Sequence, residues 1–154
     1  MAHHVSNFNI QNLTRRAIPG VPFVELKNKV LGDAYDLSLT FAGDRRIRKW
    51  NTTYRQKDKT TTILSFPLSS TEGEIFINLR LVRDRWTMLM LFIHGLYHLK
   101  GHEHGTLMER HEETLRSAYE KKLGIFEHGT KKDNHGNRHR DISNTRDRVR
   151  VRQR

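Results

Sequence analysis

The chain contains no cysteine among its 154 residues. Disulfide bonds are therefore excluded, and a metal ion would have to be held by histidine or carboxylate side chains, because no thiolate is available. No apolar run approaches the roughly 20 residues that a membrane-spanning helix needs, so we expect no membrane partner. The start of the chain also lacks the pattern of a secretory signal peptide, which makes a cytoplasmic location the default expectation.

Acidic residues are few relative to basic ones: 17 Asp and Glu stand against 28 Lys and Arg, a formal net charge of +11. Excess positive charge favours a polyanionic partner through counterion release, and nucleic acid is the partner we expect. The alternative is a basic protein whose charge serves only its solubility. The length suits one domain with a sizeable core.

A motif rich in histidine lies between residues 91 and 105, where His94, His98, Gly101 and His104 follow the pattern H-x-x-x-H-x-x-G-x-x-H. Two histidines four residues apart share one face of a helix, so both rings can reach one metal ion. Glycine adopts a left-handed conformation at a helix end without steric cost, which lets the chain turn back and supply His104. Three protein ligands leave one position of a tetrahedral zinc ion open, as in catalytic sites. The motif therefore predicts a hydrolytic metalloenzyme.

His102 is the alternative third ligand, because it also stands four residues after His98. It would replace His104 if the helix continued through Gly101. Glycine costs about 1 kcal/mol relative to alanine in a helix interior, which favours a helix end at this position. We therefore expect His104 to complete the set.

The residue after the first histidine is Gly95, where metzincin peptidases of the same spacing carry a glutamate. That glutamate is the general base of peptide hydrolysis. Peptidase activity by that mechanism is therefore not expected, whereas an activated water acting on another electrophile remains possible.

Hydrophobic periodicity predicts an α+β fold, with a small mixed sheet of about four strands packed against about four helices. Asp44 is expected to cap the second helix, and the third helix is apolar on every side from residue 88 to 93, so it should be central, buried and carry the metal site. Strands are expected around residues 8–10, 35–42 (half-buried), 63–66 and 75–79, and helices over 23–31, 44–55, 80–100 and 106–122.

The composition changes at Glu127, and arginines occupy alternate positions from 146 to 154. A segment with so few large apolar residues cannot offset its ordering entropy. We expect a hydrolase domain over residues 1–126 and a disordered basic tail over 127–154, which is either a solvated extension or an electrostatic arm for RNA or the ribosome.

Three segments resemble one known family. The run HGLYHLKGHEH is similar to the HGxLHLxGYDH signature of the YbeY family of zinc-dependent endoribonucleases implicated in ribosomal RNA maturation. Residues 54–67, YRQKDKTTTILSFP, resemble that family's YRxKDxPTDVLSFP block, and GEIFINL at 73–79 resembles its GDI-type strand. The resemblance spans residues 47–113, and it departs from the family pattern at Tyr97, His102, Glu103 and 60–62.

The resemblance implies a metal-dependent endoribonuclease that is specific for single strands and acts in ribosomal RNA maturation or ribosome quality control. It implies one Zn²⁺ per chain on the three histidines, and it assigns a catalytic role to Arg55, which matches the arginine of the YRxKD block. A guanidinium stays charged and donates in a fork, which suits it to the scissile phosphate. The alternative is that Arg55 pairs with an acidic neighbour such as Asp58.

Four further basic residues are candidates for RNA binding. Lys57 and Lys59 would guide RNA without taking part in the chemistry. Arg48 and Lys49 lie on the preceding helix, where the alternative is a solvated face. Two other functions stay open: a metal-stabilised factor that binds the ribosome or ribosomal RNA without catalysis, and, less favoured, a metzincin-like peptidase. The sequence does not indicate the oligomeric state.

Overall fold

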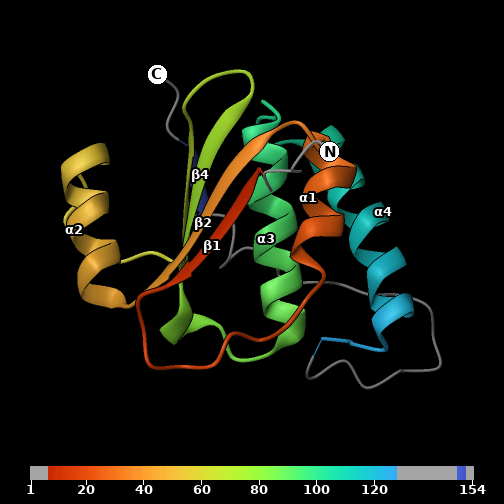
Figure 1. Ribbon diagram of the computed structural model, residues 1–154, viewed down its shortest axis with the longest axis horizontal. Coiled ribbons are helices and arrows are strands. Elements are labelled where there is room, and N and C mark those ends of the chain that lie inside the picture. The colour runs from red at the N-terminus through yellow and green to blue at the C-terminus, as the bar shows by residue number, and fades with distance from the viewer. Residues whose placement is uncertain (1–6, 128–148, 152–154) are drawn as a thin grey trace, which may run out of the picture.

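The computed structural model describes residues 7–127, and of 149–151 the backbone. Its elements form a sheet covered by helices on both faces (Figure 1). In chain order they are β1 (Phe8–Asn12), α1 (Phe23–Leu31), β2 (Asp36–Ala42), α2 (Asp44–Arg55), β3 (Ile63–Pro67), β4 (Glu72–Asn78), a 3₁₀ turn (Leu79–Leu81), α3 (Arg85–Leu99), α4 (Thr106–Leu123) and β5 (Val149–Val151).

The strands are hydrogen-bonded in the order β1-β2-β4-β3-β5. β1 and β4 flank β2 in parallel, β3 and β4 form an antiparallel hairpin, and β5 joins β3 in parallel. Helices α1, α3 and α4 lie on one face of this sheet and α2 lies on the other (Figure 1). The predicted mixed sheet with four helices is confirmed, and β5 is an additional short strand beside β3.

Strand β2 is more deeply buried than its alternating sequence predicted. Leu37, Leu39 and Phe41 are fully buried in the core on the α3 side. Ala42, on the other face, is also fully buried, in a second cluster that contains Ile47 of α2. The prediction of a half-buried strand was wrong because it could not anticipate a helix on the second face.

Helix α3 is the central buried helix that its sequence predicted, with ten of its residues buried from Met88 onward. The Phe92 ring lies 5.1 Å from the Phe23 ring of α1 and 6.3 Å from the Phe8 ring of β1, centroid to centroid. The helix begins later than expected: Asp84 caps it by accepting a 2.8 Å hydrogen bond from the Thr87 backbone N–H.

Asp44 does not cap α2. The cap position is Gly43, and Asp44 is the first residue of the helix. Its carboxylate instead accepts a 2.6 Å hydrogen bond from Asn78 Nδ2 at the end of β4, and it pairs with Arg80 of the 3₁₀ turn. These contacts hold the pKa of Asp44 below its ordinary value, the Asn78 hydrogen bond being the largest cause. The side chain thus links the start of α2 to the chain after β4.

The predicted basic tail lies almost wholly outside the described residues, which include only Glu127 and the β5 backbone from it. Among the helices that the structure describes, none has the length and apolar character needed to cross a bilayer.

Candidate metal centre

The C-terminus of α3 turns back sharply at Gly101, which has a φ of +96°. The Gly101 N–H donates to the carbonyl of His98 (3.0 Å), and the His102 N–H donates to the carbonyl of Tyr97 (3.1 Å). This pair of hydrogen bonds is the Schellman motif, which requires a left-handed residue that glycine adopts without strain. The helix therefore ends where the sequence predicted, and the chain reverses before His104.

The reversal brings the rings of His94, His98 and His104 together. Their centroids are 4.4 Å apart for His94 and His98, 4.5 Å for His98 and His104, and 5.3 Å for His94 and His104. One nitrogen of each ring lies within 4.8 Å of the others, and the Nε2 atoms of His94 and His98 are 2.8 Å apart. Nitrogen ligands around a tetrahedral zinc ion lie about 3.3 Å apart, given zinc–nitrogen bonds of 2.0–2.1 Å. Three nitrogen donors at this spacing fit one metal ion.

Burial favours the neutral, metal-binding form of His98. The residue is only 4% exposed, and this burial, followed by the charges of His94 and His104, lowers the pKa of His98 to about 3. A neutral imidazole keeps a nitrogen lone pair for a metal ion. His94 is largely buried and His104 is exposed, so the cluster opens to solvent on the His104 side.

Glu112 of α4 touches this cluster, a contact that the motifs of the sequence do not predict. Its Oε1 contacts Nδ1 of His94, and both side chains are largely buried, at 20% and 13% exposure. No local pattern pointed to Glu112, because the contact depends on how α4 packs across α3.

His102 lies outside the group of three. Its ring packs 5.4 Å from that of Tyr97 and 5.3 Å from that of His111 on α4, centroid to centroid. The Tyr97 and His111 rings are themselves 5.8 Å apart. The three rings form an aromatic cluster beside the histidines that face the candidate metal position.

Gly95 packs closely against the sheet. A Cβ atom there would lie 3.0 Å from Cδ1 of Ile63, 3.1 Å from Cδ1 of Ile75 and 3.1 Å from Oγ of Ser65. A glutamate side chain at this position would point into the sheet rather than toward the three histidines. The position therefore cannot supply the base of a metzincin peptidase.

Arg55 is the last residue of α2 and is half-buried. Helices α2 and α3 follow the parallel strands β2 and β4 and both run back along the sheet, so their C-termini lie at the same end of it, on opposite faces (Figure 1). Arg55 and the three histidines thus share one end of the molecule. Asp58, the partner considered for Arg55, binds Arg48 through hydrogen bonds of 2.8 and 3.1 Å.

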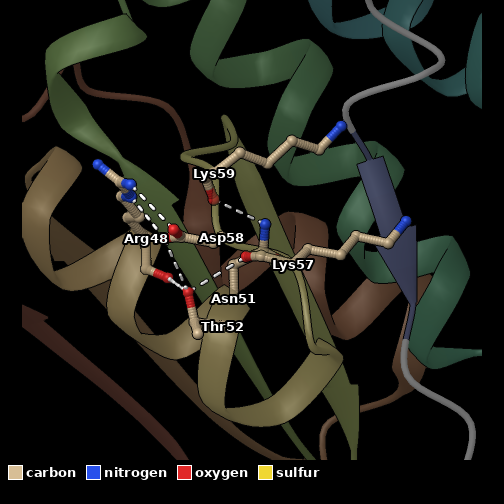
Figure 2. A network of polar contacts seen from close by, with 6 residues as sticks. All are labelled: Arg48, Asn51, Thr52, Lys57, Asp58 and Lys59. Atoms are coloured by element: carbon tan, nitrogen blue, oxygen red, sulfur yellow. Dashed lines mark hydrogen bonds and ion pairs between the residues drawn. The ribbon is translucent and has the colours of Figure 1, made fainter.

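The loop after α2 is held against that helix (Figure 2). Asn51 Nδ2 donates to the carbonyl of Lys59 (2.8 Å), and the Lys57 N–H donates to the carbonyl of Asn51 (3.2 Å). With the backbone fixed, the side chains of Lys57 and Lys59 extend to the same side, toward β5 and away from Arg48 (Figure 2). Lys49 is exposed on α2.

Known proteins of one family are similar to this chain along most of its length. The sequence profile of the family described as Endoribonuclease YbeY matches residues 2–125. Endoribonuclease YbeY of Pelagibacter ubique is 30% identical over 99 residues, which cover 53% of this chain and 65% of that protein. Endoribonuclease YbeY of Finegoldia magna is 31% identical over 114 residues, which cover 61% of this chain and 72% of that protein.

The fold also has a solved counterpart, the solution structure of TM1509 from Thermotoga maritima. The two structures align with a TM-score of 0.54 and 18% sequence identity, over 80% of this chain and 99% of that one. With a matching profile over residues 2–125, related sequences and this fold, the chain belongs to the YbeY family of endoribonucleases.

Proposed function

We propose that the protein is a metal-dependent endoribonuclease that cleaves single-stranded RNA during ribosomal RNA maturation in the cytoplasm. The observation that carries this proposal is the convergence of His94, His98 and His104 on one point that is open to solvent. The residues fit a single Zn²⁺ ion, which would supply Lewis acidity and activate water at neutral pH.

In this proposal the histidines would hold the ion and the basic residues would bind RNA. His94 and His98 are fixed by the buried helix α3, so little rearrangement is needed to receive the ion. Arg55, at the same end of the sheet, would bind the non-bridging oxygens of the scissile phosphate with its forked donors. Lys57 and Lys59 would hold the flanking phosphates, and Arg48 and Lys49 would add to the positive field.

The test uses the full chain, ribosomal RNA and an unstructured RNA oligonucleotide, each incubated with and without a chelator. We expect cleavage that the chelator abolishes, and about one zinc ion per chain by metal analysis. His98→Ala should lose both the metal and the cleavage, whereas His102→Ala should keep the metal. RNA binding that survives chelation without any cleavage would instead indicate a binding factor.

Arg55→Ala should keep the metal and lose cleavage, typically by 100-fold or more for a group that stabilises transition-state charge. The matched control is Arg83→Ala, which removes an exposed arginine just before the N-terminus of α3, the opposite end from the histidines. Equal cleavage by both arginine variants would remove Arg55 from the mechanism.

A further inference from the structure

Helix α4 contributes one carboxylate to the neighbourhood of the three histidines. Glu112 reaches α3 from a helix that begins only after the turn at Gly101, and its Oε1 contacts Nδ1 of His94. Both side chains are largely shielded from water, at 20% and 13% exposure for Glu112 and His94. Glu112 Oε1 is buried without another hydrogen-bond partner in the described part of the chain, and a carboxylate oxygen accepts, so an N–H at Nδ1 of His94 would satisfy it.

Such a hydrogen bond would determine which nitrogen of His94 is available to a metal ion. A neutral imidazole carries one N–H, and a proton held at Nδ1 leaves the lone pair at Nε2. Nε2 is the atom that lies 2.8 Å from Nε2 of His98, inside the group of three. Glu112 therefore favours the tautomer of His94 whose lone pair faces the candidate metal position.

The same geometry excludes Glu112 as a ligand of that ion. Its carboxylate is on the Nδ1 side of the His94 ring, whereas the three histidines converge on the Nε2 side. Carboxylates that accept a hydrogen bond from a metal-binding histidine orient the ring and raise its basicity, and losing them typically lowers metal affinity by 10 to 100-fold.

We propose that Glu112 is a positioning residue for the metal site: it holds the His94 ring and its tautomer ready for the ion without touching the ion or the RNA. This inference rests on the proposed metal site, and it assigns α4 a part in building that site.

The experiment compares Zn²⁺ affinities of the full-length protein and its variants by competition with a chromophoric chelator. Glu112→Ala should bind Zn²⁺ about 10 to 100-fold more weakly than the unchanged protein. Glu112→Gln keeps a neutral acceptor and should lie between the two, which supplies a second variant should Glu112→Ala fail to fold. The matched control is Glu113→Ala, which removes the next, exposed glutamate of the same helix and should bind like the unchanged protein.

A second measurement separates positioning from a merely structural contact between helices. In the metal-free protein, ¹⁵N NMR of His94 should show the proton on Nδ1, and Glu112→Ala should shift His94 toward the tautomer protonated on Nε2. Zinc affinity of Glu112→Ala within twofold of Glu113→Ala, or an unchanged tautomer, would overturn the role of Glu112. If His98→Ala also bound Zn²⁺ normally, the proposed metal site itself would be wrong.

Discussion

Gly95 offers a direct test of how closely α3 must approach the sheet to place the histidines. In the structure a Cβ atom at this position would meet three side-chain atoms at once, at 3.0 to 3.1 Å. Such contacts are tighter than ordinary van der Waals contact, so each neighbour would have to move by a few tenths of an ångström. The change Gly95→Ala should therefore stabilise the protein through helix propensity and destabilise it through overpacking.

The two effects have similar sizes, and their difference determines the sign. In a helix interior alanine is more favourable than glycine by about 1 kcal/mol. Overpacking a close-packed core costs about 1 to 3 kcal/mol. Because Ile63 and Ile75 are fully buried and Ser65 is fully buried with them, we expect overpacking to prevail, with a net destabilisation of about 1 kcal/mol. For a chain of this size that corresponds to a fall in Tm of about 2 to 4 °C.

The assay is denaturant unfolding of a double-mutant cycle. Ile63→Val removes Cδ1, the atom that lies 3.0 Å from the added Cβ. In the unchanged protein this substitution should cost about 0.5 to 1.5 kcal/mol. In the Gly95→Ala background it should cost less, since the same deletion relieves a clash, and the two changes should be coupled.

Two results would refute this reasoning. One is a Gly95→Ala protein that is more stable than the unchanged chain, and the other is strict additivity with Ile63→Val. Gly95→Glu extends the test, because it would bury an unpaired charge against the sheet, which costs far more than a methyl group. It should unfold the protein or destabilise it strongly, and it should create no peptidase activity.

Two further predictions concern pH and RNA. Without metal, the protein should lose stability as the pH falls below about 6.5. The pKa of His98 is lowered from 6.5 to about 3 in the folded protein. Between these pH values the unfolded chain therefore binds a proton that the folded chain does not. The loss is at most about 1.4 kcal/mol per pH unit, measured by denaturant unfolding, and a flat profile between about pH 7 and about pH 5 would contradict it. Replacing Lys57 and Lys59 with alanine should lower the slope of log affinity for single-stranded RNA against log salt by about 1.4, whereas Arg48→Ala should change it less because Asp58 already holds that guanidinium. Fluorescence anisotropy measures the affinities. An equal change of slope in Arg48→Ala and in the double lysine variant would show that Arg48 contributes as much as the two lysines.

The sequence was sufficient for the features that depend on local chain geometry. The four-residue spacing of His94 and His98 places both rings on one helix face, and Gly101 ends that helix because of its backbone freedom. His104 then follows from the direction of the reversed chain. The all-round apolar pattern of α3 likewise predicted a buried helix, because no other environment suits such a surface.

Features that depend on how elements pack across one another were not accessible in this way. Glu112 stands on α4, and its sequence context is that of an ordinary charged helix. Asp44 looked like a helix cap by its position, but Asn78 and Arg80 bring competing donors from the end of β4 and the turn after it. Which donor binds a carboxylate depends on the arrangement of distant segments.

The departures from the family signature are a further case, beside the candidate metal centre, in which the packing of distant residues explains what the sequence order does not. Read along the chain, a tyrosine at 97 in place of leucine and a histidine at 102 in place of tyrosine are two unrelated changes. In the structure the two rings pack together, 5.4 Å apart, and Tyr97 is 9% exposed. The larger side chain at 97 and the smaller ring at 102 therefore lie side by side against His111. Because His102 faces this aromatic cluster while His104 joins His94 and His98, the two changes lie beside the candidate metal centre and outside its group of three histidines.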